Sequence, residues 1–450
     1  MKKFVISLGV IGILLGAAYL LSQRDEVQTN RTVVLSDGSL VDFVAVTVGT
    51  NHFPNPRLGE LLSRLPEPVV DKMQGLLGVK TGKVRHRTSE TNLVVWIEHR
   101  GFAGGANTSA SAVLRRPGDR TSGRDQHIGF WLPMGTSNKV HSVSFASWPR
   151  REAWIECVIL ERDHNYEKVE IGSFRFRNPW IVSTPSWSPE PESIVKSAGD
   201  LKVTLRHFVT GVGDHKSQRR GADGQKEHVY RAASPNQDAH ALVNVDFESP
   251  RGTNETWILF NADLSDSVGN KVGAGSRSEM TDTMRFSPIL WPNEGAWNLR
   301  LHMKRKSGFL PGEMLSFSNI PLPAVGTTNV LNLTNTATGI EAWLAEIRRR
   351  PPLDSDTQSW SSRDISRIRL EHEDLGETNQ IDLVSMTIQP SGERLKSSGS
   401  SWSNDYHEYN LRNLPPSATH LDLRFSVQKA RFVDFRVAPN WVTNEFLLRE

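Results

Sequence analysis

The sequence is poor in cysteine, with one residue, Cys157, among 450. A single cysteine excludes an intramolecular disulfide and a cysteine-based zinc site, so the folded parts must be stable through their cores alone. Catalytic signatures are lacking as well, because the chain contains no G-x-S-x-G nucleophile elbow, no phosphate loop and no H-E-x-x-H. The sequence therefore predicts no catalytic residue.

A strong charge of either sign is also missing. The 53 lysines and arginines nearly balance the 50 aspartates and glutamates, and the longest basic run is the RRR at 348–350. Proteins that bind nucleic acid usually show a basic patch or stripe. We therefore expect no nucleic-acid partner.

What the sequence does have is an apolar N-terminus within residues 1–24. Lys2 and Lys3 precede an uncharged run over residues 4–21, the layout of an export signal or a membrane anchor. The run is marginally long enough to span a hydrocarbon layer of ~30 Å. We expect an uncleaved, helical signal anchor that holds the bulk of the chain outside the cytoplasm, in the periplasm or at the cell surface. A cleaved signal peptide, which would make the protein secreted, is the alternative.

Related segments recur along the chain. The runs WPRREAWIECVIL, WPNEGAWNLRLHM and LPPSATHLDLRFSV begin at Trp148, Trp291 and Leu414. In each, a proline precedes a long strand-like run, as expected where a loop enters a strand, because proline cannot donate to a β ladder. Strand-like closing segments follow in the same order at 174–180, 315–323 and 434–441.

These landmarks predict an all-β protein of three tandem β-sandwich domains, Ig-like or jelly-roll-like, after the apolar N-terminal helix. The expected domains cover residues 32–180, 194–323 and 327–441, and the Pro- and Ser-rich stretch 182–193 connects the first two. Leucines at helical spacing predict a small helical insertion, 57–77, in the first domain. This helix either caps the first sandwich or lies on the membrane.

The opening strands carry the pattern L-x-D-G-x-x-V-x-x-x-x-V-T-x-G-x-x-H over residues 35–52. In this pattern the chain resembles uncharacterised, signal-bearing bacterial proteins. The resemblance implies extracytoplasmic β domains, and it implies no activity.

Tryptophans fall into two groups by context. Trp148, Trp154, Trp291 and Trp297 recur at repeat positions, so we expect them to be buried in cores. Three others lie between serines and are candidates for ligand binding through an exposed indole face, or for packing under their own loops: Trp187, Trp360 and Trp402.

One turn contains candidate metal ligands. Asp263, Asp266 and Asn270 cluster in DLSDSVGNK and offer oxygens suited to Ca²⁺, although ordinary turns use the same residue types. We expect no other cofactor.

Repeated units without motif chemistry favour a non-catalytic, membrane-anchored extracytoplasmic binding or scaffold protein. Its expected partners are the membrane, through residues 4–21, and an envelope protein or polysaccharide. The alternative is an extracytoplasmic hydrolase with a carboxylate-based site in the first domain, near the glycine-rich segment 101–112.

Overall fold

Strands dominate the computed structural model. Of the described residues, 67% lie in strands and 1% in helices, which confirms the all-β class. The structure describes residues 31–49, 51–52, 84–85, 91–100, 110–117, 127–129, 139–162, 168–191, 193–220, 224–233, 239–249, 256–273, 277–280, 282–286, 290–291, 294–351, 366–376, 378–403, 405–411 and 414–449.

Several expectations fall outside these residues. They are the N-terminal helix within 1–24, the helical insertion at 57–77 and the position of Trp360. Within the described ranges, no helix is long and apolar enough to cross a membrane.

The first hydrophobic core lies between two four-stranded sheets. One sheet has the order β1 (Thr32–Val34), β2 (Leu40–Val48), β5 (Leu93–Arg100) and β8 (Lys139–Phe145), and the other β10 (Lys168–Arg177), β9 (Trp154–Arg162), β6 (Ala110–Arg115) and β7 (His127–Gly129). Alternate residues of both sheets point inward, among them Phe43, Ile97, Cys157 and Phe174. We call these two sheets and their core unit 1; the short pair β3 (Asn51–His52) and β4 (Val84–Arg85) forms a separate ladder.

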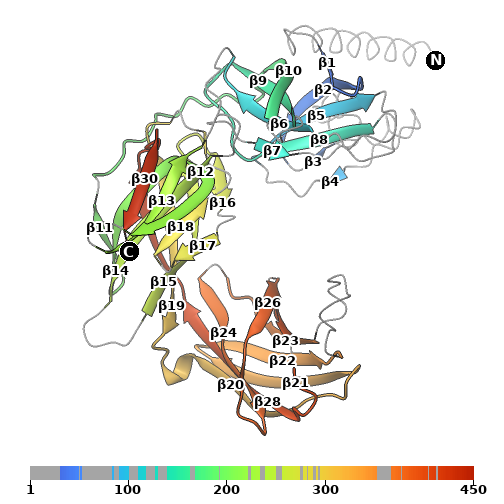
Figure 1. Cartoon of the computed structure of the whole chain (residues 1–450), viewed down its shortest axis with the longest axis vertical. Coiled ribbons are helices and arrows are strands. Elements are labelled where there is room, and N and C mark those ends of the chain that lie inside the picture. Colours follow the sequence, from blue (N-terminus) through green and yellow to red (C-terminus); the bar gives the residue numbers. More distant parts are fainter. Residues whose placement is uncertain are drawn as a thin grey trace, which may run out of the picture.

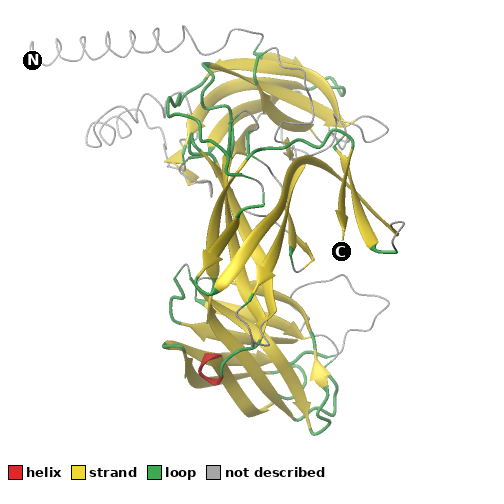
Figure 2. Cartoon of the chain, turned by 90° about the vertical axis from the view of Figure 1, so that its left-hand side faces the viewer, coloured by secondary structure: helices red, strands yellow, loops and turns green. Residues whose placement is uncertain are grey.

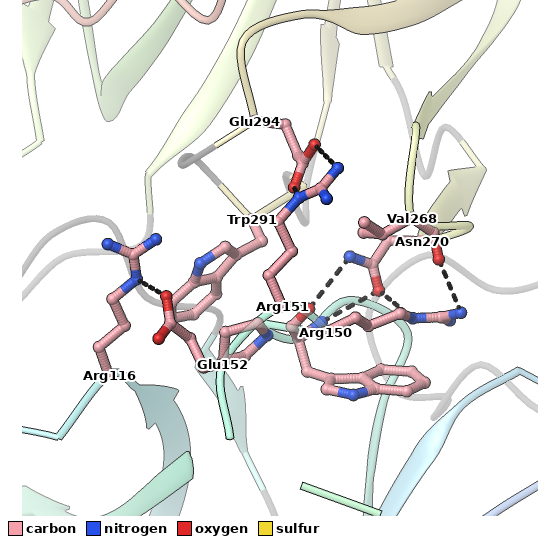
Figure 3. Close-up of a pocket in the computed structure, with 10 residues that line it drawn as sticks. Arg116, Arg150, Arg151, Glu152, Val268, Asn270, Trp291 and Glu294 are labelled. Carbon is pink, nitrogen blue, oxygen red and sulfur yellow. Dashed lines mark hydrogen bonds and ion pairs between the residues drawn. The ribbon is translucent and has the colours of Figure 1, made fainter. Parts of the chain in front are cut away.

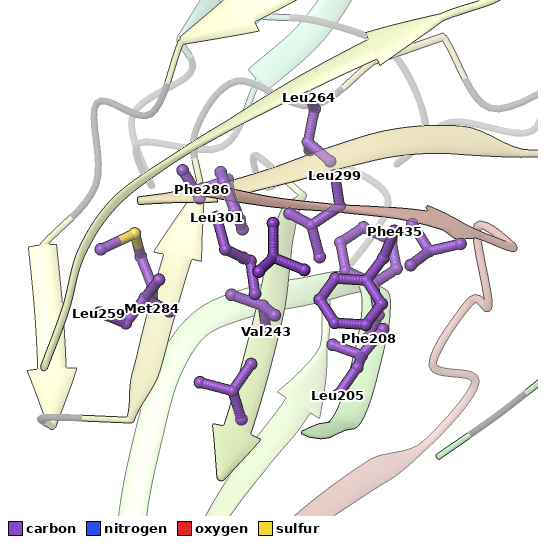
Figure 4. Packing of buried hydrophobic residues seen from close by; sticks show 14 of the residues in the cluster. Leu205, Phe208, Val243, Leu259, Leu264, Met284, Phe286, Leu299, Leu301 and Phe435 are labelled. Atoms are coloured by element: carbon purple, nitrogen blue, oxygen red, sulfur yellow. The ribbon is translucent and has the colours of Figure 1, made fainter. Parts of the chain in front are cut away.

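Unit 2 is the pair of sheets around the second core. The larger sheet has the order β17 (Arg277–Met280), β18 (Thr283–Phe286), β14 (His240–Glu248), β12 (Leu201–Arg220), β13 (Lys226–Ala232) and β30 (Glu445–Arg449), with β11 (Val195–Ala198) on β12. The smaller has the order β16 (Lys271–Gly273), β15 (Thr256–Asp266), β19 (Trp297–Ser307) and β29 (Arg431–Val437). Figure 4 shows side chains of both sheets, including Val243, Leu299 and Phe435, interleaved in this core.

Unit 3 is the pair of sheets around the third core. One sheet has the order β20 (Met314–Pro321), β28 (His420–Lys429), β24 (Asn379–Gln389) and β25 (Arg394–Leu395), and the other β21 (Thr328–Ala337), β22 (Ile340–Arg348), β23 (Ser366–His372), β27 (Tyr406–Leu411) and β26 (Ser397–Trp402). A single 3-10 turn, η1 (Pro311–Glu313), precedes β20. The three units follow one another along the molecule, with unit 1 and unit 3 at opposite ends (Figure 1).

Strand pairing divides units 2 and 3 differently from the expected ranges 194–323 and 327–441. The strand β20 pairs with β28 of unit 3, whereas β29 and β30 pair with β19 and β13 of unit 2. Buried side chains agree, because Phe317 lies in the third core and Phe435 in the second. Unit 3 is therefore inserted in the chain between β19 and β29, two adjacent strands of unit 2. Figure 2 shows strands that extend from unit 2 toward unit 3. Sequence similarity among strand ends carries no information on such distant pairing.

The repeat tryptophans do not all behave as expected. Trp148, Trp291 and Trp297 are buried, but Trp154 is only half-buried and its indole stacks with Arg175. In β9 the inward residues begin at Ile155, whereas in β19 they begin at Trp297 itself. The two strands thus differ in phase by one residue, which moves Trp154 to the outer face.

Candidate functional site at the junction of units 1 and 2

Two copies of the repeated tryptophan segment meet at the junction between units 1 and 2. Trp148 and Trp291 come from different units, yet both indoles are buried in the first core. The backbone N–H of Trp291 donates to Ser147 Oγ at 2.8 Å. Unit 2 therefore contributes a side chain to the core of unit 1.

Arg150 is the central polar side chain of this junction and is 2% exposed. Its Nε donates to Asn270 Oδ1 at 2.9 Å and its Nη1 to the Val268 carbonyl at 3.2 Å, both in unit 2. Its Nη2 donates to the Thr91 carbonyl of unit 1 at 2.9 Å. The guanidinium also stacks on the Trp148 ring, 3.8 Å from the ring centroid. One buried side chain thus bonds to both units. Figure 3 shows its hydrogen bonds to Asn270 and Val268 of unit 2.

Asn270 links Arg150 to the buried carboxylate of Asp266 through hydrogen bonds. Its amide Nδ2 donates to Asp266 Oδ2 at 2.7 Å and to the Trp148 carbonyl at 3.1 Å. Burial raises the pKa of Asp266 to about 6 and lowers the pKa of Arg150 to about 10. Burial therefore destabilises the ionised forms of both Asp266 and Arg150. The hydrogen bonds through Asn270 offset part of this desolvation cost.

A second bridge lies beside the first. Arg151 donates to both carboxylate oxygens of Glu294, at 2.7 and 3.0 Å, and Ser267 Oγ donates to the same carboxylate at 2.7 Å. Burial raises the pKa of Glu294, but the bonds from Arg151, Ser267 and Ser186 outweigh it and hold the pKa below its ordinary value. This bidentate ion pair fixes the orientation of the Arg151 and Glu294 side chains as well as pairing their charges.

The connector between units 1 and 2 is fastened to the same surface. Arg151 donates to the Thr184 carbonyl, and Thr184 Oγ1 donates to the Ser267 carbonyl at 2.8 Å. Further along, the Glu190 N–H donates to the carbonyl of Arg436 in β29 at 2.8 Å. The connector is therefore held along unit 2 by its own hydrogen bonds.

Arg150, Arg151, Asn270 and Glu294 are among the residues that line a small recess at this junction. Its lining holds no serine, cysteine or histidine, and its two glutamates, Glu152 and Glu294, pair with Arg116 and Arg151. Arg150 and Arg151 thus bond across the two units at this recess, to Asn270 and Glu294.

The predicted calcium ligands are not gathered in one place. Asp266 and Asn270 bond to each other in the junction, whereas Asp263 lies 3.0 Å from His302 Nε2. Asp263 and Asp266 are three residues apart in β15, so their side chains point to opposite faces of the strand. Within the described part of the chain, no three His, Cys, Asp or Glu side chains are placed to hold a metal ion. Calcium binding stays a prediction.

Two of the three candidate binding tryptophans can be placed. Trp187 is half-buried, with Arg436 stacked over its ring at 5.3 Å and its carbonyl close to Gly295. Trp402 ends the strand β26, and its backbone pairs with His407. Trp187 therefore helps to fasten the connector to unit 2, and its role in ligand binding stays a prediction.

Sequence reasoning missed the residues that matter most here, Arg150, Arg151 and Glu294. A signal was present, because all three lie within the repeated segments that begin at Trp148 and Trp291. Comparison of the chain with protein-family models and with curated proteins gives no significant match to either.

Proposed function

We propose that the protein is a non-catalytic, membrane-anchored extracytoplasmic scaffold or binding protein. Its three two-sheet units act as β-sandwich domains, and residues 4–21 hold the chain in a membrane. The observation that carries this proposal is the Arg150 contact, in which one buried guanidinium bonds to Thr91 of unit 1 and to Asn270 of unit 2. Flexible linkage is the usual condition of domains in one chain, so a buried bridge of this kind supports a fixed spacing between them.

The junction of units 2 and 3 supports the same function. Two stretches of chain cross it, one after β19 and one before β29, because unit 3 is inserted between these strands. The buried amide of Gln428 accepts from the Arg305 N–H at 2.8 Å and donates to the Arg305 carbonyl at 2.9 Å. Lys304 of unit 2 pairs with Asp382 of unit 3 at 2.6 Å. Two chain crossings restrict rotation more than a single linker does.

Repetition supports a mechanical role over catalysis. In the first two units, residues of the segments that begin at Trp148 and Trp291 form the joint. In unit 3, the matching segment at Leu414 receives hydrogen bonds from Arg349 to the carbonyls of Pro415 and Pro416. The repeated segment thus joins two units at the first junction, and in unit 3 it is bonded within its own unit. The partner we propose for the assembled surface is an envelope protein or polysaccharide.

The test combines topology with binding. Protease added to intact spheroplasts should digest the chain beyond residue 30, with a cytoplasmic protein as the protected control. The full-length chain should then bind envelope polysaccharide or protein fractions, and Arg150→Ala should weaken any binding that spans units 1 and 2. Full protection from the protease would contradict the proposed location, and unchanged binding in the variant would contradict a role for fixed spacing.

A further inference from the structure

The flank of unit 3 formed by β20 and β21 carries no charge. Residues 314–340 contain no Asp, Glu, Lys, Arg or His, although 23% of the whole chain is Asp, Glu, Lys or Arg. Among the described strands, both lie at the end of their sheets, β20 pairing with β28 only and β21 with β22 only. A long neutral edge is unusual, because exposed edge strands are commonly blunted by charged side chains.

Unit 1 offers a comparison within the same molecule. Its edge strand β10 is as long as β21, but it carries Lys168, Glu170, Arg175 and Arg177. Charged side chains on β10 discourage pairing with another strand, whereas β21 has no such protection. The difference points to β21 as an edge that is left open.

The open part of β21 is its first half. In the second half, Asn335 Nδ2 donates to the Ser316 carbonyl of β20 at 2.9 Å, and Asn335 Oδ1 accepts from the Thr336 N–H at 2.8 Å. In the open part, which extends as far as Leu333, Val330 is 73% exposed and Leu333 is 41% exposed. Two large apolar side chains thus face solvent where no described strand pairs with the outer edge of β21.

A bulge lies between these two residues. Val330 pairs with Glu346 and Leu333 with Leu344, so β21 has one more residue than β22 over this step, and Asn332 takes a left-handed conformation with φ of 52°. A regular strand paired with the outer edge of β21 would have no residue opposite this extra one. A second β21, related by a two-fold axis, would bring its own extra residue to the same place and keep both ladders in register.

We propose that β21 is a self-association edge that pairs antiparallel with β21 of a second copy of this chain. Val330 of each copy lies beside Leu333 of the other, and the two-fold axis passes between Leu331 and Asn332. Neutral side chains impose no like-charge repulsion across this axis. The pairing does not depend on the scaffold role, because it concerns an edge far from the Arg150 junction.

Variants with one added cysteine test both the partner and the register. Cys157 is buried and burial raises the pKa of its thiol to about 12, so it supplies little background reactivity. Full-length Val330→Cys and Leu333→Cys chains, carrying different tags, are co-expressed in one cell and oxidised. A mixed disulfide dimer is expected in the co-expressed sample, with much less dimer in either variant alone, since only paired residues lie within disulfide distance. Val169→Cys on β10, 43% exposed, is the matched control and should stay monomeric.

The mass of the purified full-length chain is the second measurement. The natural sequence should form a dimer, and Val330→Lys should raise the dimer dissociation constant by at least about tenfold, with an unchanged circular dichroism spectrum. Val169→Lys should have no effect on the mass. A monomer at all concentrations, a mixed disulfide no more abundant than in the single-variant samples, or equal cross-linking through Val169→Cys would overturn the proposal.

Discussion

Replacing Arg150 with alanine should uncouple units 1 and 2. The substitution removes three hydrogen bonds from a charged donor, to the acceptors on Asn270, Val268 and Thr91. Each such bond contributes about 1.5–3 kcal/mol. Part of that gain offsets the cost of burying the guanidinium, a cost visible in the lowered pKa of Arg150. We therefore expect a net loss of about 3–4 kcal/mol, close to what breaking a buried ionic network costs.

Calorimetry separates this loss from a general loss of stability. In the natural sequence, units 1 and 2 should unfold in one transition, and in Arg150→Ala the transition should split, with unit 1 melting first. Arg116→Ala is the matched control, because the Arg116–Glu152 pair in the same recess is more than one third exposed and should contribute under about 1 kcal/mol. A loss below about 1 kcal/mol in Arg150→Ala, or a single transition as sharp as before, would refute the reasoning.

Four further substitutions follow from the structure. Trp297→Ala should cost about 3–5 kcal/mol in urea unfolding and Trp154→Ala under about 1.5 kcal/mol, since one indole is in a core and the other is on an outer face; equal costs would contradict the phase difference. Burial holds the pKa of Asp266 near 6 in the native state, so its native form keeps a proton that the unfolded form loses, and the unfolding free energy should fall as pH rises from about 4 to about 6. Asp266→Asn should abolish this part of the pH dependence, and an identical pH profile would rule the assignment out. Gly211→Ala should cost more than about 2 kcal/mol and expose the C-terminal strand to proteolysis, because Gly211 has a φ of 77° and a Cβ there would clash with the Trp441 ring; a variant as protease-resistant as the natural sequence would refute this.

The sequence predicted the fold class and part of the core. Alternating apolar residues and the proline-led runs indicated strands, and the buried positions of Trp148, Trp291 and Trp297 follow from their recurrence. The phase of β9 was not predictable from the repeat, because a shift of one residue exchanges the two faces of a strand without changing its composition.

Long-range strand pairing was the larger part of the fold that the sequence did not predict. β29 joins β19 across the whole of unit 3, and the similarity between the closing segments 315–323 and 434–441 compared strands that belong to different units. The junction was predicted in part, because the sequence analysis identified the repeated segments from which its residues come. That Arg150 of one segment would reach Asn270, 120 residues away, depends on how two units meet, which no local pattern records.

The most direct test of the central claim is the distance between units 1 and 2 in the full-length chain. Spin labels at Val169→Cys in unit 1 and Val195→Cys in unit 2 occupy exposed positions, and Cys157 is buried. Pulsed electron paramagnetic resonance should give one narrow distance peak for the natural junction and a broadened distribution when Arg150→Ala is added. A broad distribution in the natural junction, unchanged by Arg150→Ala, would contradict the account of a fixed scaffold.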